Sequence, residues 1–413
     1  KGLRHRVLTM HLLLIHQNFP GQFRDLAPAW LQEGHQVSAI SAADPPSGEA
    51  WNGLIHYGYE VPEPSSITML RRGKIVGQVC RKLQKQGLMP ELVLAHSGWG
   101  EALQLRRIWE KTPLIVMPEL WGCSSALGIG FDASLDGKTL DGNPFELPNL
   151  VSELSLVQAD AALVASRSQL HSFPHQLQSR LTLLPEGLDL SHVHPNSQAT
   201  VELPQTKLKA GEPIVTFVSR QLEPLRGLRQ VLRAWPRVSA AHPQAQLLLI
   251  GDEFSNGYGV EAPQGPSHLQ DAMEEWDDQV DRNRVHLLGF LDHSTMLQVL
   301  QCSACHLALS YPYTLSWSVL EAMACAAPLI TNVGSPIEPE LVHNESGLII
   351  PFNDDQALIN AILQLLKNRD KRRRLGKAGR KIVEERFNLQ TSLLQYERLF
   401  ERLHRSHASE ELI

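Results

Sequence analysis

Short apolar runs alternate with longer stretches of mixed polarity along most of the chain. Runs of this kind, without polar residues at every second position, are typical of parallel strands that are buried on both faces. The stretches between them contain good helix formers, so the pattern predicts an α/β protein built from strand–helix repeats. The predicted strands are residues 11–16, 36–40, 91–95, 114–117, 161–165, 181–184, 214–218, 246–250, 285–288, 305–309 and 329–330.

A polar, proline-containing stretch without any periodicity interrupts this alternation at residues 191–213. Such a stretch is typical of a linker. It predicts an N-terminal domain over residues 1–190 and a C-terminal domain over residues 214–388, each with its own parallel sheet. The length of 413 residues leaves room for two or three domains of ordinary size.

The predicted helix over residues 65–85 is strongly basic. Its cations are Arg71, Arg72, Lys74, Arg81, Lys82 and Lys85. They favour a solvated helix face, and the alternative is a contact with anionic lipid or with an anionic acceptor. No apolar run reaches 18 residues, so we expect no membrane-spanning helix. The first apolar run is short and lacks a small-residue cleavage site, which favours a strand over a signal peptide.

Composition narrows the class of protein. Hydrophobic residues make up 43% of the chain and charged residues 20%, which is typical of a globular protein. The net charge of −6 argues against a nucleic-acid binder. Five cysteines in a long chain do not form an obvious disulfide framework, so the sequence predicts a cytoplasmic protein, with membrane contact through residues 65–85 as a peripheral option.

The stretch from residue 305 to residue 330 carries the strongest local signal. An apolar run is followed by a loop, a helix that starts near Trp317, and a second apolar run after Pro328. The N-terminus of such a helix lies at the carboxyl edge of a parallel sheet, where its free N–H groups favour an anion such as phosphate. We therefore expect Leu315, Ser316 and Trp317 to contact a phosphorylated donor.

Two arginines stand at the start of the second predicted domain. Arg220 and Arg226 follow the strand at 214–218, and Gly227 follows directly. Arginine can grip a diphosphate with two parallel hydrogen bonds, and a fixed cation stabilises the charge that grows on a leaving diphosphate. The alternative for either arginine is a surface ion pair. The chain has no Asp-x-Asp pair, the usual ligand set for a metal-held diphosphate, so we expect no metal. We expect no cofactor either.

Three strand ends of the first domain carry candidate site residues. The first turn contains Gln17, Asn18 and Gly21, and a glycine there lets the backbone approach a ligand closely, although a plain tight turn explains it too. His96 directly follows the strand at 91–95, and Glu119 follows the strand at 114–117. A histidine at a carboxyl strand end favours the ligand side of the sheet, with a hydrogen-bonded structural histidine as the alternative.

The stretch from Tyr313 to Pro328 resembles the C-terminal signature of the family-4 glycosyltransferases. That signature has two glutamates separated by seven residues, followed by A-M-A-x-G-x-P. Glu321 matches the second glutamate, and Ala322, Met323, Ala324 and Pro328 match the residues after it. The resemblance implies that Glu321 binds the ribose of a nucleotide. Tyr313 stands where the first glutamate would touch the donor sugar, and a hydroxyl does not accept hydrogen bonds as a carboxylate does.

Other parts of the chain carry the same resemblance. Arg220, Arg226 and Gly227 resemble an Arg, Lys and Gly set with the same spacing, and Gly289 and Phe290 lie where the family holds the base. In the resembled family the first turn approaches the donor phosphates and the acceptor, and His96 matches a histidine with a role in the mechanism. Glu186 stands in place of an asparagine in a turn that closes the N-terminal domain. The glycine- and aspartate-rich residues 128–147 suit a mobile loop on the acceptor side.

The resemblance implies a GT-B fold, in which two Rossmann-like domains face each other across a cleft. A C-terminal helix at about 389–408 would complete the first domain, which holds the acceptor, whereas the second domain holds the nucleotide-sugar donor. The implied reaction is metal-independent transfer of a hexosyl group to a glycan, lipid or small-molecule acceptor, with retention of anomeric configuration. The alternatives are an enzyme similar to nucleotide-sugar epimerases and a binding protein that kept the fold without catalysis.

Overall fold

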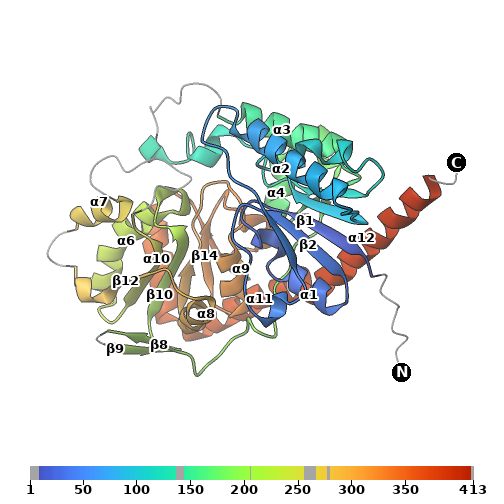
Figure 1. The fold of residues 1–413 in the computed structure, drawn as a ribbon. Coiled ribbons are helices and arrows are strands. Elements are labelled where there is room, and N and C mark those ends of the chain that lie inside the picture. The colour runs from blue at the N-terminus through green and yellow to red at the C-terminus, as the bar shows by residue number, and fades with distance from the viewer. Residues whose placement is uncertain (1–8, 136–143, 205, 255–266, 277–279, 411–413) are drawn as a thin grey trace, which may run out of the picture. The chain divides into compact units, whose positions relative to one another are not determined.

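A computed structural model describes residues 9–135, 144–204, 206–254, 267–276 and 280–410. The chain forms two compact units (Figure 1). Unit 1 contains residues 1–122, 141–189 and 387–413, and unit 2 contains residues 123–140 and 190–386. Among the described residues, no helix is long and apolar enough to cross a membrane.

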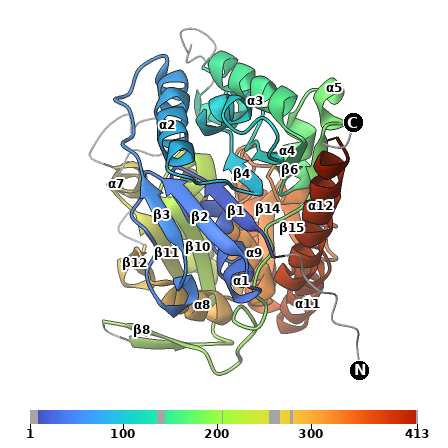
Figure 2. The same ribbon diagram turned by 45° about the vertical axis from the view of Figure 1, so that its right-hand side comes forward.

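Unit 1 is built around a parallel sheet with the strand order β3-β2-β1-β4-β5-β6-β7 (Figure 2). Side chains of β1 alternate between two core clusters: Leu12 and Leu14 face one, and Leu13 and Ile15 face the other. The central strands are therefore buried on both faces, as their apolar runs predict. The strands are β1 (His11–Ile15), β2 (Gln36–Ser41), β3 (Ile55–Gly58), β4 (Leu92–His96), β5 (Leu114–Met117), β6 (Ala161–Val164) and β7 (Leu181–Leu183).

Helices cover both faces of this sheet. One core cluster contains Trp30 of α1 and Tyr396 of α12, and the other contains Val76 of α2 and Leu156 of α3. Ser166 accepts a hydrogen bond from the Gln169 N–H and so caps α4. The helices of unit 1 are α1 (Leu26–Gln32), α2 (Thr68–Lys85), α3 (Glu146–Gln158), α4 (Arg167–Ser172), α5 (His175–Gln178) and α12 (Leu389–Glu410), with 3₁₀ turns η1 (Gly21–Phe23), η2 (Glu49–Trp51) and η3 (Glu101–Arg107).

The last helix belongs to unit 1 although it follows unit 2 in the sequence. Tyr396 and Phe400 of α12 pack against Trp30, with ring centroids 5.6 and 5.5 Å from the indole. The Leu188 N–H donates to the Phe387 carbonyl at 2.7 Å, and the Leu389 N–H donates to the Leu188 carbonyl at 3.0 Å. Backbone hydrogen bonds therefore join the start of α12 to Leu188, near the end of the second segment of unit 1.

Unit 2 contains a parallel sheet with the order β12-β11-β10-β13-β14-β15. Its strands are β10 (Ile214–Gln221), β11 (Gln246–Asp252), β12 (Val285–Gly289), β13 (Cys305–Leu307), β14 (Leu329–Asn332) and β15 (Leu348–Ile350). Its helices are α6 (Leu228–Ala241), α7 (His268–Glu274), α8 (His293–Cys302), α9 (Trp317–Ala324), α10 (Asp355–Lys367) and α11 (Arg369–Arg386), with 3₁₀ turns η4 (Ser124–Leu127), η5 (Ala133–Leu135), η6 (Pro224–Arg226), η7 (Arg282–Arg284) and η8 (Glu338–Glu340). Two parallel α/β sheets in one chain agree with the expected fold class.

The predicted linker at 191–213 is more ordered than its composition indicates. It contains an antiparallel pair, β8 (Thr200–Leu203) and β9 (Thr206–Lys209). Val201 and Leu208 are buried in a core cluster with Ile214. The partly buried Leu203 packs against the same cluster, so a few apolar residues attach the pair to unit 2. So few residues give little periodic signal.

Residues 123–135 pack in unit 2 rather than in the first domain, where the sequence analysis placed them. Leu135 joins the main core cluster of unit 2. The Tyr311 hydroxyl donates to the buried Asp132 carboxylate at 2.5 Å. The rings of Phe131, Tyr311 and Phe352 form a compact trio with centroids 5.1–5.8 Å apart. The described part of the expected loop at 128–147 is thus held by a core, and residues 136–143 lie outside the described residues.

Arg72 corrects the interpretation of the basic helix α2. Its side chain is buried, and its guanidinium donates to the Trp99 carbonyl at 2.8 Å. Five of the six predicted cations remain exposed to solvent: Arg71, Lys74, Arg81, Lys82 and Lys85. Arg72 is therefore part of the interior of unit 1 and not of its solvated face.

Glu186 lies in the turn before Leu188 and is buried. Burial, together with the Asp25 and Glu119 carboxylates, raises the pKa of Glu186 to about 7, although Arg24 opposes the shift. Between its ordinary pKa of 4.5 and about 7, the folded protein keeps a proton that the unfolded chain has lost. The stability that this proton supplies is complete below pH 4.5 and is lost as the pH rises through 7.

We predict that Glu186→Gln increases the free energy of unfolding at pH 8 by about 1–3 kcal/mol, because glutamine cannot ionise in the buried turn. At pH 4.5 the variant and the wild type should unfold with similar free energies. Urea unfolding at both pH values measures this difference, with the exposed Glu110→Gln as the matched control. A variant that is no more stable than the wild type at pH 8 would contradict the assignment.

Candidate functional site

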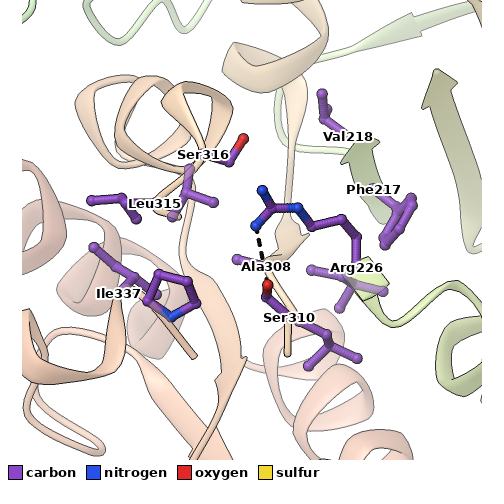
Figure 3. A pocket seen from close by; sticks show the side chains of 12 residues that line it. Phe217, Val218, Arg226, Ala308, Ser310, Leu315, Ser316 and Ile337 are labelled. Atoms are coloured by element: carbon purple, nitrogen blue, oxygen red, sulfur yellow. Dashed lines mark hydrogen bonds between the residues drawn. The ribbon is translucent and has the colours of Figure 1, made fainter. Parts of the chain in front are cut away.

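Arg226 is held by several contacts with the loop at 310–314. Its guanidinium donates to the Ser310 hydroxyl at 3.0 Å (Figure 3). It also donates to the Thr314 carbonyl at 3.1 Å. It also lies over the Tyr313 ring, 5.5 Å from the centroid. Gly227 has a φ of 78°, and a Cβ at this position would lie 2.5 Å from the Leu309 Cβ, so only glycine fits after Arg226. The loop at 310–314 therefore fixes this positive charge from three sides.

Arg226 lines a small pocket of about 20 Å³ at the carboxyl edge of the unit 2 sheet (Figure 3). Leu315 and Ser316 line it as well, directly before α9 begins. The Val319 N–H donates to the Ser316 carbonyl at 3.2 Å, and the backbone N–H groups at a helix start all point toward its N-terminal end. They supply partial positive charge beside the guanidinium, which makes the floor of this pocket suited to an anion. The other lining residues are Phe217, Val218, Leu307, Ala308, Leu309, Ser310, Val319, Pro336 and Ile337.

Glu321 lies one turn further along α9, and its side chain is only 1% exposed. Its Oε1 atom is 2.8 Å from Nε2 of His293, the first residue of α8. The imidazole itself is 47% exposed. The predicted ribose-binding carboxylate is therefore covered by a histidine that the sequence analysis did not select.

The remaining predicted donor residues of unit 2 are more dispersed. Arg220 lies on β10 and is exposed, and it is not among the residues that line the pocket. Gly289 ends β12, and Phe290 follows it with 68% of its side chain exposed. Trp317 is half-buried at the first position of α9. The structure thus brings Arg226, Leu315 and Ser316 together around one pocket and places the Tyr313 ring against the Arg226 guanidinium. The role of the others stays a prediction.

A cluster of three rings marks the carboxyl edge of the unit 1 sheet. His96 ends β4, and its ring centroid lies 4.9 Å from that of His16 and 4.3 Å from that of Trp99. The sequence analysis missed His16 and Trp99. One signal could have identified His16: it follows β1 as His96 ends β4, and these two strands are neighbours in the sheet.

His96 is completely buried and lies between carboxylates. Its Nε2 is 3.7 Å from the Glu119 Oε2, which is long for a hydrogen bond but close enough for a strong charge interaction. Burial lowers the pKa of His96, but the Glu119 and Glu101 carboxylates outweigh it, so the pKa is raised overall. Burial also raises the pKa of Glu101, a fully buried residue that the sequence analysis did not single out.

The first turn surrounds the same ring cluster. The Asn18 N–H donates to His16 Nδ1 at 3.0 Å, and the Gln17 carbonyl accepts the N–H groups of Ala42 and Ala43. A Cβ on Gly21 would lie 2.3 Å from the His16 ring. Gly21 is therefore required for packing against His16. This contact agrees with the tight-turn alternative for Gly21. It does not test whether the backbone there approaches a ligand. Within unit 1, the structure gathers His96, Glu119 and the first turn at one sheet edge.

Comparisons with known proteins agree with this arrangement. Residues 200–382 match the family model of the glycosyl transferases group 1, and residues 52–193 match that of the glycosyl transferase family 4 group. Together the two matches cover most of both units. The chain belongs to the family-4 glycosyltransferases.

Relatives of this glycosyltransferase with assigned names are distant. A mannosyltransferase of Corynebacterium glutamicum, named as GDP-mannose-dependent and acting on a monoacylated phosphatidylinositol monomannoside, is 26% identical over 58% of the chain and 63% of its own length. A D-inositol 3-phosphate glycosyltransferase of Segniliparus rotundus is 23% identical over 83% of the chain and 74% of its own length. The chain thus spans less than two thirds of the first of these relatives.

Solved structures show that the glycosyltransferase has the GT-B fold. Sucrose-phosphate synthase from Thermosynechococcus elongatus superposes with a TM-score of 0.76 and 21% identity, over 96% of the chain and 99% of the synthase. The Anabaena HepE protein in complex with UDP gives a TM-score of 0.66 and 17% identity, over 95% and 100% of the two chains. The predicted family and fold class are therefore confirmed.

We predict that Arg226→Ala weakens binding of a nucleoside diphosphate by about 1.5–3 kcal/mol, because it removes a charge-assisted contact. Tyr313→Leu should weaken binding by about 0.5–1 kcal/mol through loss of the ring beneath the guanidinium, and Tyr313→Phe should bind normally. Calorimetry with UDP and GDP measures both effects. Arg233→Ala, which removes an exposed ion pair with Asp355, is the matched control. Unchanged affinity of Arg226→Ala would remove this residue from the site.

We predict that His96→Ala lowers kcat by at least about tenfold, a barrier change of about 1.4 kcal/mol, with little change in nucleoside-diphosphate affinity. The physical reason is that His96 lies in unit 1, whereas the anion pocket lies in unit 2. Turnover per folded molecule, measured beside the melting temperature, checks this, with the exposed His171→Ala as the control. A lower melting temperature with normal kcat would show that His96 is structural.

Proposed function

We propose that this protein transfers a sugar from a nucleotide-diphosphate sugar to an acceptor, with retention of anomeric configuration and without a metal ion. The observation that carries the proposal is Arg226, which is held by Ser310, Tyr313 and Thr314 beside the N-terminus of α9. As the glycosidic bond to the diphosphate breaks, negative charge grows on the leaving oxygen. A cation that is already fixed stabilises this charge without the cost of reorganisation.

Nucleoside-diphosphate sugars are the donor class that the positive charge around this pocket favours. A guanidinium and a helix N-terminus both favour phosphate oxygens. The Glu321 carboxylate lies further along α9 and can accept hydrogen bonds from ribose hydroxyls once it is accessible. The relatives support this class, since one is named as GDP-mannose-dependent and another protein of the same fold was crystallised with UDP.

His96 would act by positioning rather than by proton abstraction. It lies at the carboxyl edge of its sheet beside Glu119, but its side chain is completely buried, so the groups packed over it must move before a sugar or acceptor hydroxyl can reach the ring. Holding the anomeric carbon against the acceptor converts a bimolecular step into an oriented one. This assignment agrees with the notion that unit 1 serves the acceptor.

A peripheral contact with the inner face of a membrane is part of the proposal. The exposed cations of α2 would attract anionic lipid, at about 1 kcal/mol for each charge near the surface. Vesicle sedimentation with and without phosphatidylserine separates this contact from a merely solvated helix. A cytoplasmic location remains a prediction from the composition.

A metal requirement is directly testable. We predict that EDTA leaves transferase activity within about twofold of the untreated rate, because Arg226 and the α9 N-terminus supply the positive charge that a metal would otherwise provide. Activity should be measured with a chelated and a Mg²⁺- or Mn²⁺-supplemented sample. Loss of activity on chelation, restored by either ion, would overturn the metal-independent proposal.

Product analysis tests the function as a whole. The protein is incubated with a panel of UDP- and GDP-sugars, with and without candidate glycan, lipid and small-molecule acceptors. Acceptor-dependent release of nucleoside diphosphate, with the product in the anomeric configuration of the donor, supports the proposal. Conversion of the donor sugar without an acceptor would favour an epimerase-like enzyme. Nucleotide binding without any conversion would favour a binding protein, an outcome that Tyr313 and Glu186 motivate.

A further inference from the structure

The carboxylate of Glu321 poses a steric problem for the donor site. A side chain that is 1% exposed does not offer its oxygens to a ligand as large as ribose. The carboxylate is already in a hydrogen bond: Nε2 of His293 lies 2.8 Å from the Glu321 Oε1 atom. Any ligand that forms a hydrogen bond with the Glu321 Oε1 atom must therefore displace the His293 imidazole or shift it.

His293 is well placed to be replaced. It is the first residue of α8, and about half of its side chain faces solvent. The cap of α8 does not depend on it, because Asp292 accepts the Thr295 N–H at 3.0 Å and the Thr295 and Ser294 hydroxyls at 2.6 and 2.7 Å. The imidazole can thus swing into solvent while the helix start stays fixed.

We infer that the His293 imidazole covers the Glu321 carboxylate until a nucleotide binds, and that the ribose of the nucleotide then displaces it. This inference depends on the proposed function, since it assumes that a nucleoside diphosphate binds beside α9. Without nucleotide, the imidazole N–H supplies a hydrogen-bond partner that a buried carboxylate needs. With nucleotide, a ribose hydroxyl takes over the same oxygen. The exchange costs affinity, because each binding event first breaks a hydrogen bond to a charged group.

The inference predicts an unusual pair of effects for His293→Ala. The variant should bind UDP or GDP about three- to tenfold more tightly than the wild type, because the His293 imidazole no longer competes with the ribose for Oε1. Its melting temperature without nucleotide should fall by a few degrees, because Glu321 loses a partner. His293→Gln retains a donor of similar reach and should return both values toward the wild type.

Matched variants separate this role from a general disturbance of α8. Ser294→Ala removes a neighbouring hydrogen bond to Asp292 and should leave nucleotide affinity unchanged. In a Glu321→Gln background the charge-assisted bond is absent, so adding His293→Ala should change affinity by less than twofold. The double-mutant cycle thus reports whether His293 acts through Glu321.

Isothermal titration of the wild type, the four single variants and the double variant with UDP and GDP decides the question. Tighter binding by His293→Ala that disappears in the Glu321→Gln background supports the cover. Equal or weaker binding by His293→Ala overturns it, and the weaker result would make His293 a fixed support of Glu321. If the wild type binds neither nucleotide, the proposed function itself fails, which is a different outcome from failure of the cover alone.

Discussion

The charge of Arg226 and the loop that holds it are the constraint on which the donor site depends. Ser310 supplies a hydroxyl to the guanidinium, and its own backbone is fixed by the side chain of Asn332, which accepts the Ser310 N–H and donates to the Ser310 carbonyl. Tyr311 is anchored from the other side by the Asp132 carboxylate and by the Leu225 carbonyl. Side chains from β14 and from residues 123–135 thus fix one short loop, and a cation that must stabilise transient charge gains from such preorganisation.

Parallel sheets determine where these groups can meet. In unit 2, the loop after β13 and the turn after β10 leave adjacent strands at the same edge, which brings Ser310 and Arg226 into contact. In unit 1, His16 follows β1 and His96 ends the adjacent strand β4, so the two rings come together in the same way. Neighbouring parallel strands therefore convert residues distant in sequence into one site, as expected at carboxyl strand ends.

Much of this arrangement could be predicted from the sequence, and the failures have physical causes. Strand ends are visible as apolar runs, so His96, Glu119 and Arg226 could be selected from their positions after such runs. Asp132 could not, because its partner Tyr311 is distant in sequence and a glycine- and aspartate-rich stretch gives no sign of a core contact. Arg72 resembles its exposed neighbours in the sequence, yet its side chain is buried and donates to the Trp99 carbonyl. The contact between His293 and Glu321 could not be predicted, because it depends on the packing of α8 beside α9.

A crystal structure of the protein with bound UDP or GDP tests the central claim most directly. The account predicts that the diphosphate lies against the Arg226 guanidinium and the first-turn N–H groups of α9, with the ribose hydroxyls on Glu321. It further predicts that Arg226 keeps its contacts with Ser310 and Thr314 in the complex, because the site is formed before the ligand arrives. A nucleotide bound away from Arg226 and α9 would contradict the account.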